Sequence, residues 1–82
     1  MLHVVERESA QPSRFGFIVT KAVGGAVTRN LVRRRLRAVC RDILPTVTKP
    51  IDVVVRALPG SDRATWDTLH SEVASAIGKA VG

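Results

Sequence analysis

The chain has 82 residues and a formal net charge of +6, because 13 lysines and arginines outnumber seven aspartates and glutamates. A chain of this length forms one small domain with a marginal core, so we expect a single domain over residues 1–82, and its basic field favours RNA, DNA or an anionic membrane surface as partner. Cys40 is the single cysteine, which excludes an internal disulfide, and no apolar run approaches the roughly 18 residues of a membrane span, so we expect a cytoplasmic protein.

Two strand-like segments occupy the beginning of the chain. Residues 2–7 are strand-like, and residues 8–13 form a polar connection in which Pro12 acts as a breaker. In residues 14–20, Phe15, Phe17 and Val19 fall on one face, and we expect both faces of this strand to be largely covered. We expect the two strands to form a hairpin.

Residues 26–43 are predicted to form a helix that follows Gly24 and Gly25 and stops before Pro45. The glycine pair is interpreted as a turn and helix start rather than an anion-binding loop, because it lacks the lysine and hydroxyl of a P-loop. At about 100° per residue the apolar residues fall on one stripe, which contains Val32, Leu36, Val39, Cys40 and Ile43. The adjoining stripe, which we call the basic row, contains Asn30, Arg33, Arg34, Arg37 and Arg41.

The composition of this helix favours nucleic-acid binding over an ordinary solvated face. Solvated helix faces usually mix charges at i and i+4, whereas Asp42 alone opposes six arginines between residues 29 and 41. The planar fork of arginine suits phosphate oxygens and stays charged at any relevant pH. The sequence therefore predicts a helix that docks on a core and presents guanidinium groups to a polyanion.

The remaining elements are a third strand and a second helix. Residues 51–57 are apolar enough on both faces for a central strand, which residues 58–60 end. A last helix is expected over residues 63–79, capped by Ser61 or Asp62. Its core-facing stripe contains Trp66, Leu69, Val73, Ile77 and Ala80. The order strand, strand, helix, strand, helix predicts an α+β sandwich with helices against a small sheet.

Groups that could carry protein-borne catalysis or hold a metal are few. His3 and His70 have no second ligand at metal spacing, and Cys40 lies in an apolar stripe, where a buried, inert thiol is expected. The acids are scattered singly, and Asp52 has no paired carboxylate in the sequence. Trp66 is interpreted as a core anchor in preference to a base-stacking platform. We expect no catalytic residue and no metal ligand.

Residues 14–37, with the sequence RFGFIVTKAVGGAVTRNLVRRRLR, resemble the signature of the protein subunit of bacterial ribonuclease P. The resemblance extends over residues 14–60, with two departures: the family usually has arginine where this chain has Leu31, and asparagine where it has Gly25. The family's fold is an α+β sandwich like the second domain of ribosomal protein S5. Its β-α-β crossover is left-handed, against the general preference for the right-handed connection.

The resemblance implies an accessory role in an enzyme whose RNA subunit hydrolyses precursor tRNA at the 5′ end of the mature tRNA. Mg²⁺ would be held by the RNA subunit and the substrate, and the protein would bind the catalytic RNA and the 5′ leader. By motif position, Arg29, Asn30 and Arg34 are expected to face the catalytic RNA, while Arg33 and Arg37 border the leader cleft. Arg41 and Lys21 are further candidate contacts.

The resemblance also implies a basic N-terminal helix ahead of Met1, with aromatic residues that line the leader cleft. We therefore expect a truncated form or a misplaced start, a thin stacking surface for single-stranded RNA, and weak dimerisation through the first strand.

Three other function classes fit a small basic domain: a ribosomal or nucleoid protein, a membrane-surface or acidic-partner module, and a free-standing nuclease. The helix over residues 26–43 lacks the bulky aromatic residues of a membrane-surface helix. The chain also lacks the paired carboxylates that a free-standing nuclease would need.

Overall fold

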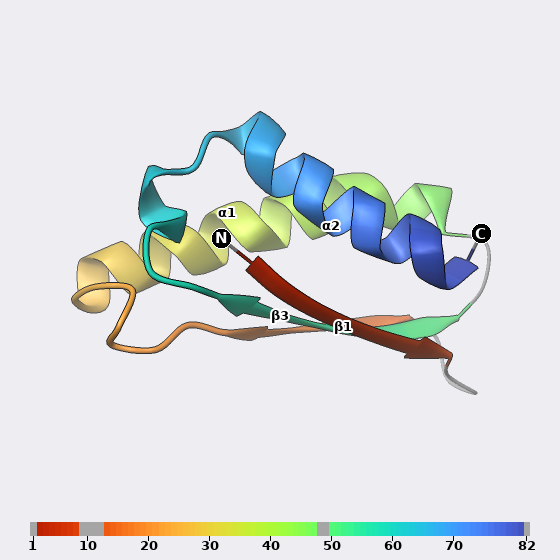
Figure 1. Cartoon of the computed structure of the whole chain (residues 1–82), viewed down its shortest axis with the longest axis horizontal. Helices are drawn as coiled ribbons and strands as arrows, with labels where there is room; N and C mark the ends of the chain where they lie inside the picture. The colour runs from red at the N-terminus through yellow and green to blue at the C-terminus, as the bar shows by residue number, and fades with distance from the viewer. Residues whose placement is uncertain (1, 9–12, 48–49, 82) are drawn as a thin grey trace.

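The computed structural model describes residues 2–8, 13–47 and 50–81. These residues form the strands β1 (Leu2–Glu8), β2 (Arg14–Ile18) and β3 (Ile51–Ala57) and the helices α1 (Ala26–Ile43) and α2 (Trp66–Val81). Short 3-10 turns follow α1 at Leu44–Thr46 and precede α2 at Ser61–Arg63. Both helices lie on the same side of the sheet (Figure 1). The predicted α+β class and element order are confirmed.

The sheet order is β1-β3-β2, with β1 antiparallel and β2 parallel to the central strand β3. The predicted central position of residues 51–57 is confirmed, but the predicted hairpin is wrong because β3 lies between the first two strands. The helix-facing side of β3 explains this choice, since Ile51, Val53 and Val55 are 1% exposed or less. A strand this apolar is best buried when it has a neighbour on each edge. Most of the predicted connection, residues 9–12, lies outside the described residues.

The connection from β2 through α1 to β3 crosses over in the left-handed sense. In Figure 1, β2 and β3 run in the same direction, α1 lies above them, and β3 lies nearer to the viewer than β2. This hand agrees with the resemblance and opposes the general preference for right-handed crossovers.

Helix α1 has the predicted boundaries, and its predicted apolar stripe is buried: Val32, Leu36, Val39, Cys40 and Ile43 are at most 4% exposed. Its N-cap is Gly25, in extended conformation without a side-chain cap. The preceding turn needs Gly24, which has φ +156°, and a Cβ atom there would lie 2.9 Å from the Cβ atom of Thr28. Pro45 lies within the 3-10 turn Leu44–Thr46 that follows the helix.

Helix α2 begins later than predicted, and Thr65 caps it. The Thr65 hydroxyl accepts a hydrogen bond from the Thr68 backbone N–H at 3.2 Å, so the predicted cap by Ser61 or Asp62 is wrong. Leu69, Val73 and Ile77 form the expected core stripe, but Trp66 is 44% exposed and is not a core anchor. Ala64, just before the helix, is buried instead. The side chain of Ala80 lies outside the described residues.

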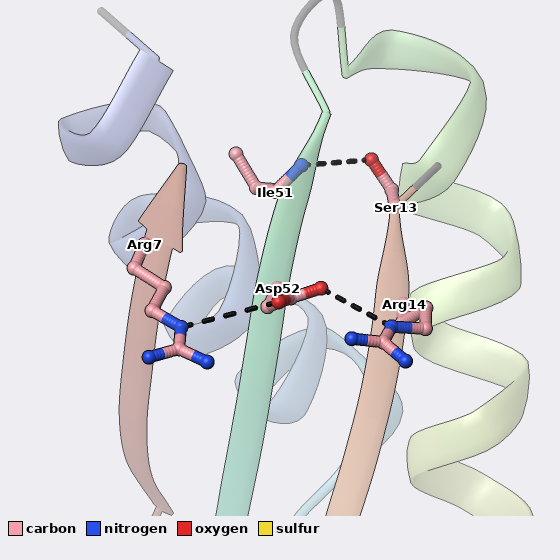
Figure 2. Close-up of polar contacts among 5 residues, drawn as sticks. All are labelled: Arg7, Ser13, Arg14, Ile51 and Asp52. Carbon is pink, nitrogen blue, oxygen red and sulfur yellow. Dashed lines mark hydrogen bonds and ion pairs between the residues drawn. The ribbon is translucent and has the colours of Figure 1, made fainter. Parts of the chain in front are cut away.

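The other face of the sheet is covered by neither helix. At one end of it, the Asp52 carboxylate lies between Arg14 Nε at 3.4 Å and Arg7 Nε at 3.9 Å (Figure 2). The Ser13 hydroxyl accepts the Ile51 backbone N–H at 3.0 Å beside this cluster. Arg7 and Arg14 thus join the two edge strands to β3 through one carboxylate. The neighbouring hollow, of about 480 Å³, has an apolar floor that includes Val5 and Val54.

Candidate nucleic-acid interface

Helix α1 presents its basic row to solvent because the apolar stripe fixes the opposite face on the core. Asn30, Arg34, Arg37 and Arg41 are exposed, and Arg33 is partly buried. The only acid of the helix, Asp42, forms a hydrogen-bond contact with His70 of α2, with 2.9 Å between Oδ2 and Nε2. This contact directs the carboxylate toward α2. No carboxylate of α1 therefore contacts the arginines of the basic row.

Two members of the basic row are fixed at the end where β2 leads into α1. Arg33 donates from one terminal nitrogen to Asn30 Oδ1 and from the other to the Val19 carbonyl, both at 3.5 Å. These weak contacts hold the guanidinium group over the end of β2 and orient the Asn30 amide. Lys21 is exposed in the turn before the helix, where its carbonyl oxygen accepts the Gly24 N–H. Arg33 and Lys21 thus both place positive charge where β2 leads into α1.

Arg29 and Arg35 lie away from this exposed surface. Arg29 is partly buried, and its Nε atom has no hydrogen-bond partner among the described residues. Arg35 NH1 donates to the Asp62 carbonyl at 2.9 Å, which attaches α1 to the turn before α2. Arg35 consequently has a structural contact, whereas the exposed arginines keep their guanidinium groups available.

A groove runs along the border between β2 and α1. We call it the phenylalanine groove; it measures about 260 Å³ and is lined by Phe15, Phe17, Arg37, Cys40, Arg41 and Leu44. The two phenylalanines alternate along β2 and are partly buried against the core. Arg37 and Arg41 lie one helical turn apart on α1 and place positive charge beside the aromatic rings. Aromatic faces next to arginines can hold unstacked bases and their phosphates.

Sequence reasoning did not find this groove. The alternation of residues 14–20 placed Phe15 and Phe17 on a common face, and helical spacing placed Arg37 beside Arg41. The phenylalanines and the arginines line one groove only because β2 is an edge strand beside α1. The expected hairpin gave β2 a different neighbour, so the groove could not be predicted. Of the two arginines expected at a cleft, Arg37 lines the groove, whereas Arg33 contacts Val19 beyond it.

The described residues contain no group of three or more His, Cys, Asp or Glu side chains that could hold a metal ion. Asp52 is engaged by Arg7 and Arg14. Cys40 is 2% exposed, and this burial raises the pKa of its thiol to about 12, so it stays protonated at neutral pH. Among the described helices, none is long and apolar enough to cross a membrane.

Comparison with known proteins identifies the family. The family model described as Ribonuclease P matches residues 1–81. The chain belongs to this family. It is 57% identical over 70 residues to the ribonuclease P protein component of Clavibacter michiganensis, a match that covers 85% of this chain and 62% of that relative. Identity to the Kocuria rhizophila component is 47% over 77 residues, covering 94% of this chain and 68% of that one.

The fold of this chain also resembles a solved ribonuclease P protein structure. The ribonuclease P protein of Thermotoga maritima matches with a TM-score of 0.82 at 24% identity, covering 99% of this chain and 78% of that one. This likeness confirms the fold, whereas the family model and the Kocuria relative confirm the family resemblance. The chain spans about three fifths of the length of the Clavibacter relative, since the match covers 62% of it.

Proposed function

We propose that this chain is the RNA-binding accessory subunit of ribonuclease P and assists a catalytic RNA in removing the 5′ leader from precursor tRNA. The observation that carries the proposal is the exposed basic row beside the phenylalanine groove, on a protein of the ribonuclease P family. Such a surface binds phosphates and unstacked bases. Hydrolysis would belong to the RNA subunit, with Mg²⁺ held by that RNA and the substrate, and the protein would act in the cytoplasm.

The surface divides into two parts that suit two RNA partners. The outward side of α1, with Asn30 and Arg34, would contact the catalytic RNA, together with Arg29 and, at the helix start, Lys21. The side toward β2, with Arg33, Arg37 and Arg41, would border the leader. Arg29 is partly buried, so an RNA phosphate would have to approach the N-terminal end of α1 closely to contact its guanidinium group.

The arginines of the open sheet face are less suited to this role. Arg7 and Arg14 flank the Asp52 carboxylate, whose negative charge opposes an approaching phosphate. Weak self-association through β1, an edge strand whose Val5 side chain is 52% exposed, is a further part of the proposal. Sedimentation at increasing salt tests it, because screening weakens repulsion between two chains of charge +6.

Reconstitution with a bacterial ribonuclease P RNA and precursor tRNA tests the proposed function. The chain should lower the Mg²⁺ concentration at which the RNA cleaves, because its arginines neutralise phosphate repulsion between RNA and substrate. The chain with Mg²⁺ but without the RNA should leave the precursor intact. Cleavage by the protein alone that is lost on Asp52→Asn would contradict the proposal, as would an unchanged Mg²⁺ requirement.

Competition between precursor tRNA and duplex DNA gives a second test. A ribosomal or nucleoid protein would share the charge but would lack selectivity for precursor tRNA. We expect precursor tRNA to displace the duplex at equal phosphate concentration. Equal competition would favour the general nucleic-acid binder.

A further inference from the structure

The outer side of α1 carries an apolar hollow within its basic surface. Val27, Asn30, Leu31 and Arg34 line a depression of about 390 Å³. Their spacing of three, four and seven residues places them on one side of the helix. Val27 is 85% exposed, and Leu31 interrupts the basic sequence between Asn30 and Arg33. We call Val27 and Leu31 the apolar pair.

The apolar pair is not part of the core: Val27 is exposed and Leu31 is partly buried. Both side chains lie outside the core cluster, which α1 joins through Val32 and Leu36 instead. A β-branched residue is disfavoured at an exposed helix position, because its χ1 rotamers are restricted there. An exposed valine beside a leucine on this basic surface therefore indicates that a binding partner covers the two side chains.

The polar residues of the hollow identify the chemistry of that partner. Asn30 Oδ1 accepts a hydrogen bond from Arg33 at 3.5 Å, which leaves the Asn30 NH₂ group as a donor toward the hollow. Arg34 is exposed and makes no hydrogen bond or ion pair with the described residues, so its guanidinium group is available for an anion. The hollow thus combines an apolar floor, a hydrogen-bond donor and a cation. A nucleotide has the matching groups: a flat base face, acceptors on the base edge, and a phosphate.

We propose that this hollow receives one unpaired nucleobase of the RNA that α1 binds. The face of the base packs on Val27 and Leu31, its edge accepts from the Asn30 amide, and an adjacent phosphate pairs with Arg34. Apolar side chains that contact or separate bases occur in other nucleic-acid complexes. Charge favours RNA over an apolar protein segment, because the charged residue in the hollow is an arginine and Asp42 is directed to His70. The inference rests on the proposed function.

The first experiment separates apolar contact from charge. The double variant Val27→Thr/Leu31→Gln keeps side-chain size and helix-compatible residues but removes the apolar surface. It should bind a bacterial ribonuclease P RNA about tenfold more weakly, with an unchanged dependence of log K on log salt. Val54→Thr, on the sheet face remote from α1 and 40% exposed, is the matched control and should bind like the parent chain. Thermal unfolding of each variant verifies that the fold is retained.

Arg34→Ala gives the opposite signature, in which the salt slope falls by roughly 0.7 to 0.9 for one lost phosphate contact. Affinity of the Val27→Thr/Leu31→Gln variant within twofold of the parent would overturn the proposal. A loss of affinity accompanied by a reduced salt slope would also overturn it, because the pair would then act through the placement of arginines.

The second experiment identifies the base itself. Abasic substitutions at unpaired positions of the same RNA should include one that weakens binding of the parent chain but does not further weaken binding of the double variant. Full additivity at all tested positions would contradict the pocket. If the parent chain neither binds this RNA nor lowers its Mg²⁺ requirement, the proposed function fails. If the parent does both and the double variant equals it, only the nucleobase pocket fails.

Discussion

Single residues around the basic row have different roles, and Arg35 shows how the structure separates them. The sequence places Arg35 among six arginines, and helical spacing directs it away from the basic row, but its partner cannot be read from spacing. In the structure it donates to the Asp62 carbonyl at 2.9 Å. That contact joins residues 27 positions apart, so it follows from the tertiary fold alone.

Arg35→Ala should therefore lower stability and leave RNA contacts intact. Loss of the charged donor to a partly buried carbonyl costs about 1 to 2 kcal/mol of unfolding free energy. Denaturant unfolding should report this loss, while the salt dependence of RNA binding stays unchanged. Arg34→Ala serves as the control, with the reverse pattern of unchanged stability and reduced salt slope. A reduced slope for Arg35→Ala would place that residue in the RNA interface.

Gly24 and Gly25 form a matched pair for testing the helix start. Gly24→Ala should cost about 1 to 3 kcal/mol of unfolding free energy, because φ +156° strains an L-residue and the new Cβ would meet Thr28. Gly25→Ala should have a much smaller effect, since its backbone is extended and a Cβ there meets no atom within 4 Å. Comparable losses at both positions would show that capping, and not backbone strain, controls this turn.

Cys40 provides a prediction for the effect of pH on stability. Burial raises the pKa of its thiol from the ordinary 9.0 to about 12, so the folded state favours the protonated form. Its stabilising contribution is complete below about pH 9 and is lost as the pH rises toward 12. Unfolding measured against pH should show a smaller alkaline decline in Cys40→Ala than in the parent chain. Equal declines would mean that other groups cause the alkaline loss.

At the scale of elements, the sequence predicted α1 well because several local signals agreed. The apolar stripe, the glycine pair and Pro45 all specify the same boundaries. The hairpin prediction failed because strand pairing depends on which strand is most apolar. The most apolar strand, β3, comes late in the chain: its Asp52 contacts Arg14 of β2 across a sequence separation of 38 residues. The predicted start of α2 was too early because the Ser61 hydroxyl donates to the Leu58 carbonyl, while Thr65, a few residues later, caps the helix.

The basic row can be tested as an element by removing two arginines on the side toward β2. Arg33→Ala/Arg37→Ala should flatten the dependence of log K on log salt by roughly 0.7 to 0.9 for each lost phosphate contact. Binding to precursor tRNA with a leader should weaken more than binding to the catalytic RNA, because these residues lie toward the phenylalanine groove. An unchanged slope in a folded double variant would remove both residues from the interface.

Across the whole molecule, charged groups are unevenly distributed over the described surface. The side of α1 toward β2 carries Arg33, Arg37 and Arg41, whereas Asp42, Asp62 and Asp67 lie along the border with α2 or on α2 itself. The sequence gives the number of charges but not this separation, which depends on how α1 and α2 pack. An RNA partner approaching from the basic side meets little opposing charge.

Binding of RNA on that side should stabilise the whole fold. A ligand that binds only the folded chain adds about 2.7 kcal/mol when its free concentration is 100 times Kd. For a chain this small, that gain raises the unfolding midpoint by roughly 10 to 20 °C. Fluorescence of Trp66, the only tryptophan and 44% exposed when folded, can follow the transition when it is excited at the long-wavelength edge of its absorption, where RNA absorbs little.

Ribonuclease P RNA should give this upward shift at low salt and lose it progressively as salt is added, because phosphate contacts release counterions. Duplex DNA at the same phosphate concentration should shift the midpoint less, since it has neither unpaired bases for the phenylalanine groove nor the shape of a folded RNA. An equal shift with both nucleic acids would mean that stabilisation comes from net charge alone. The specific surface of α1 and β2 would then contribute nothing to the choice of partner.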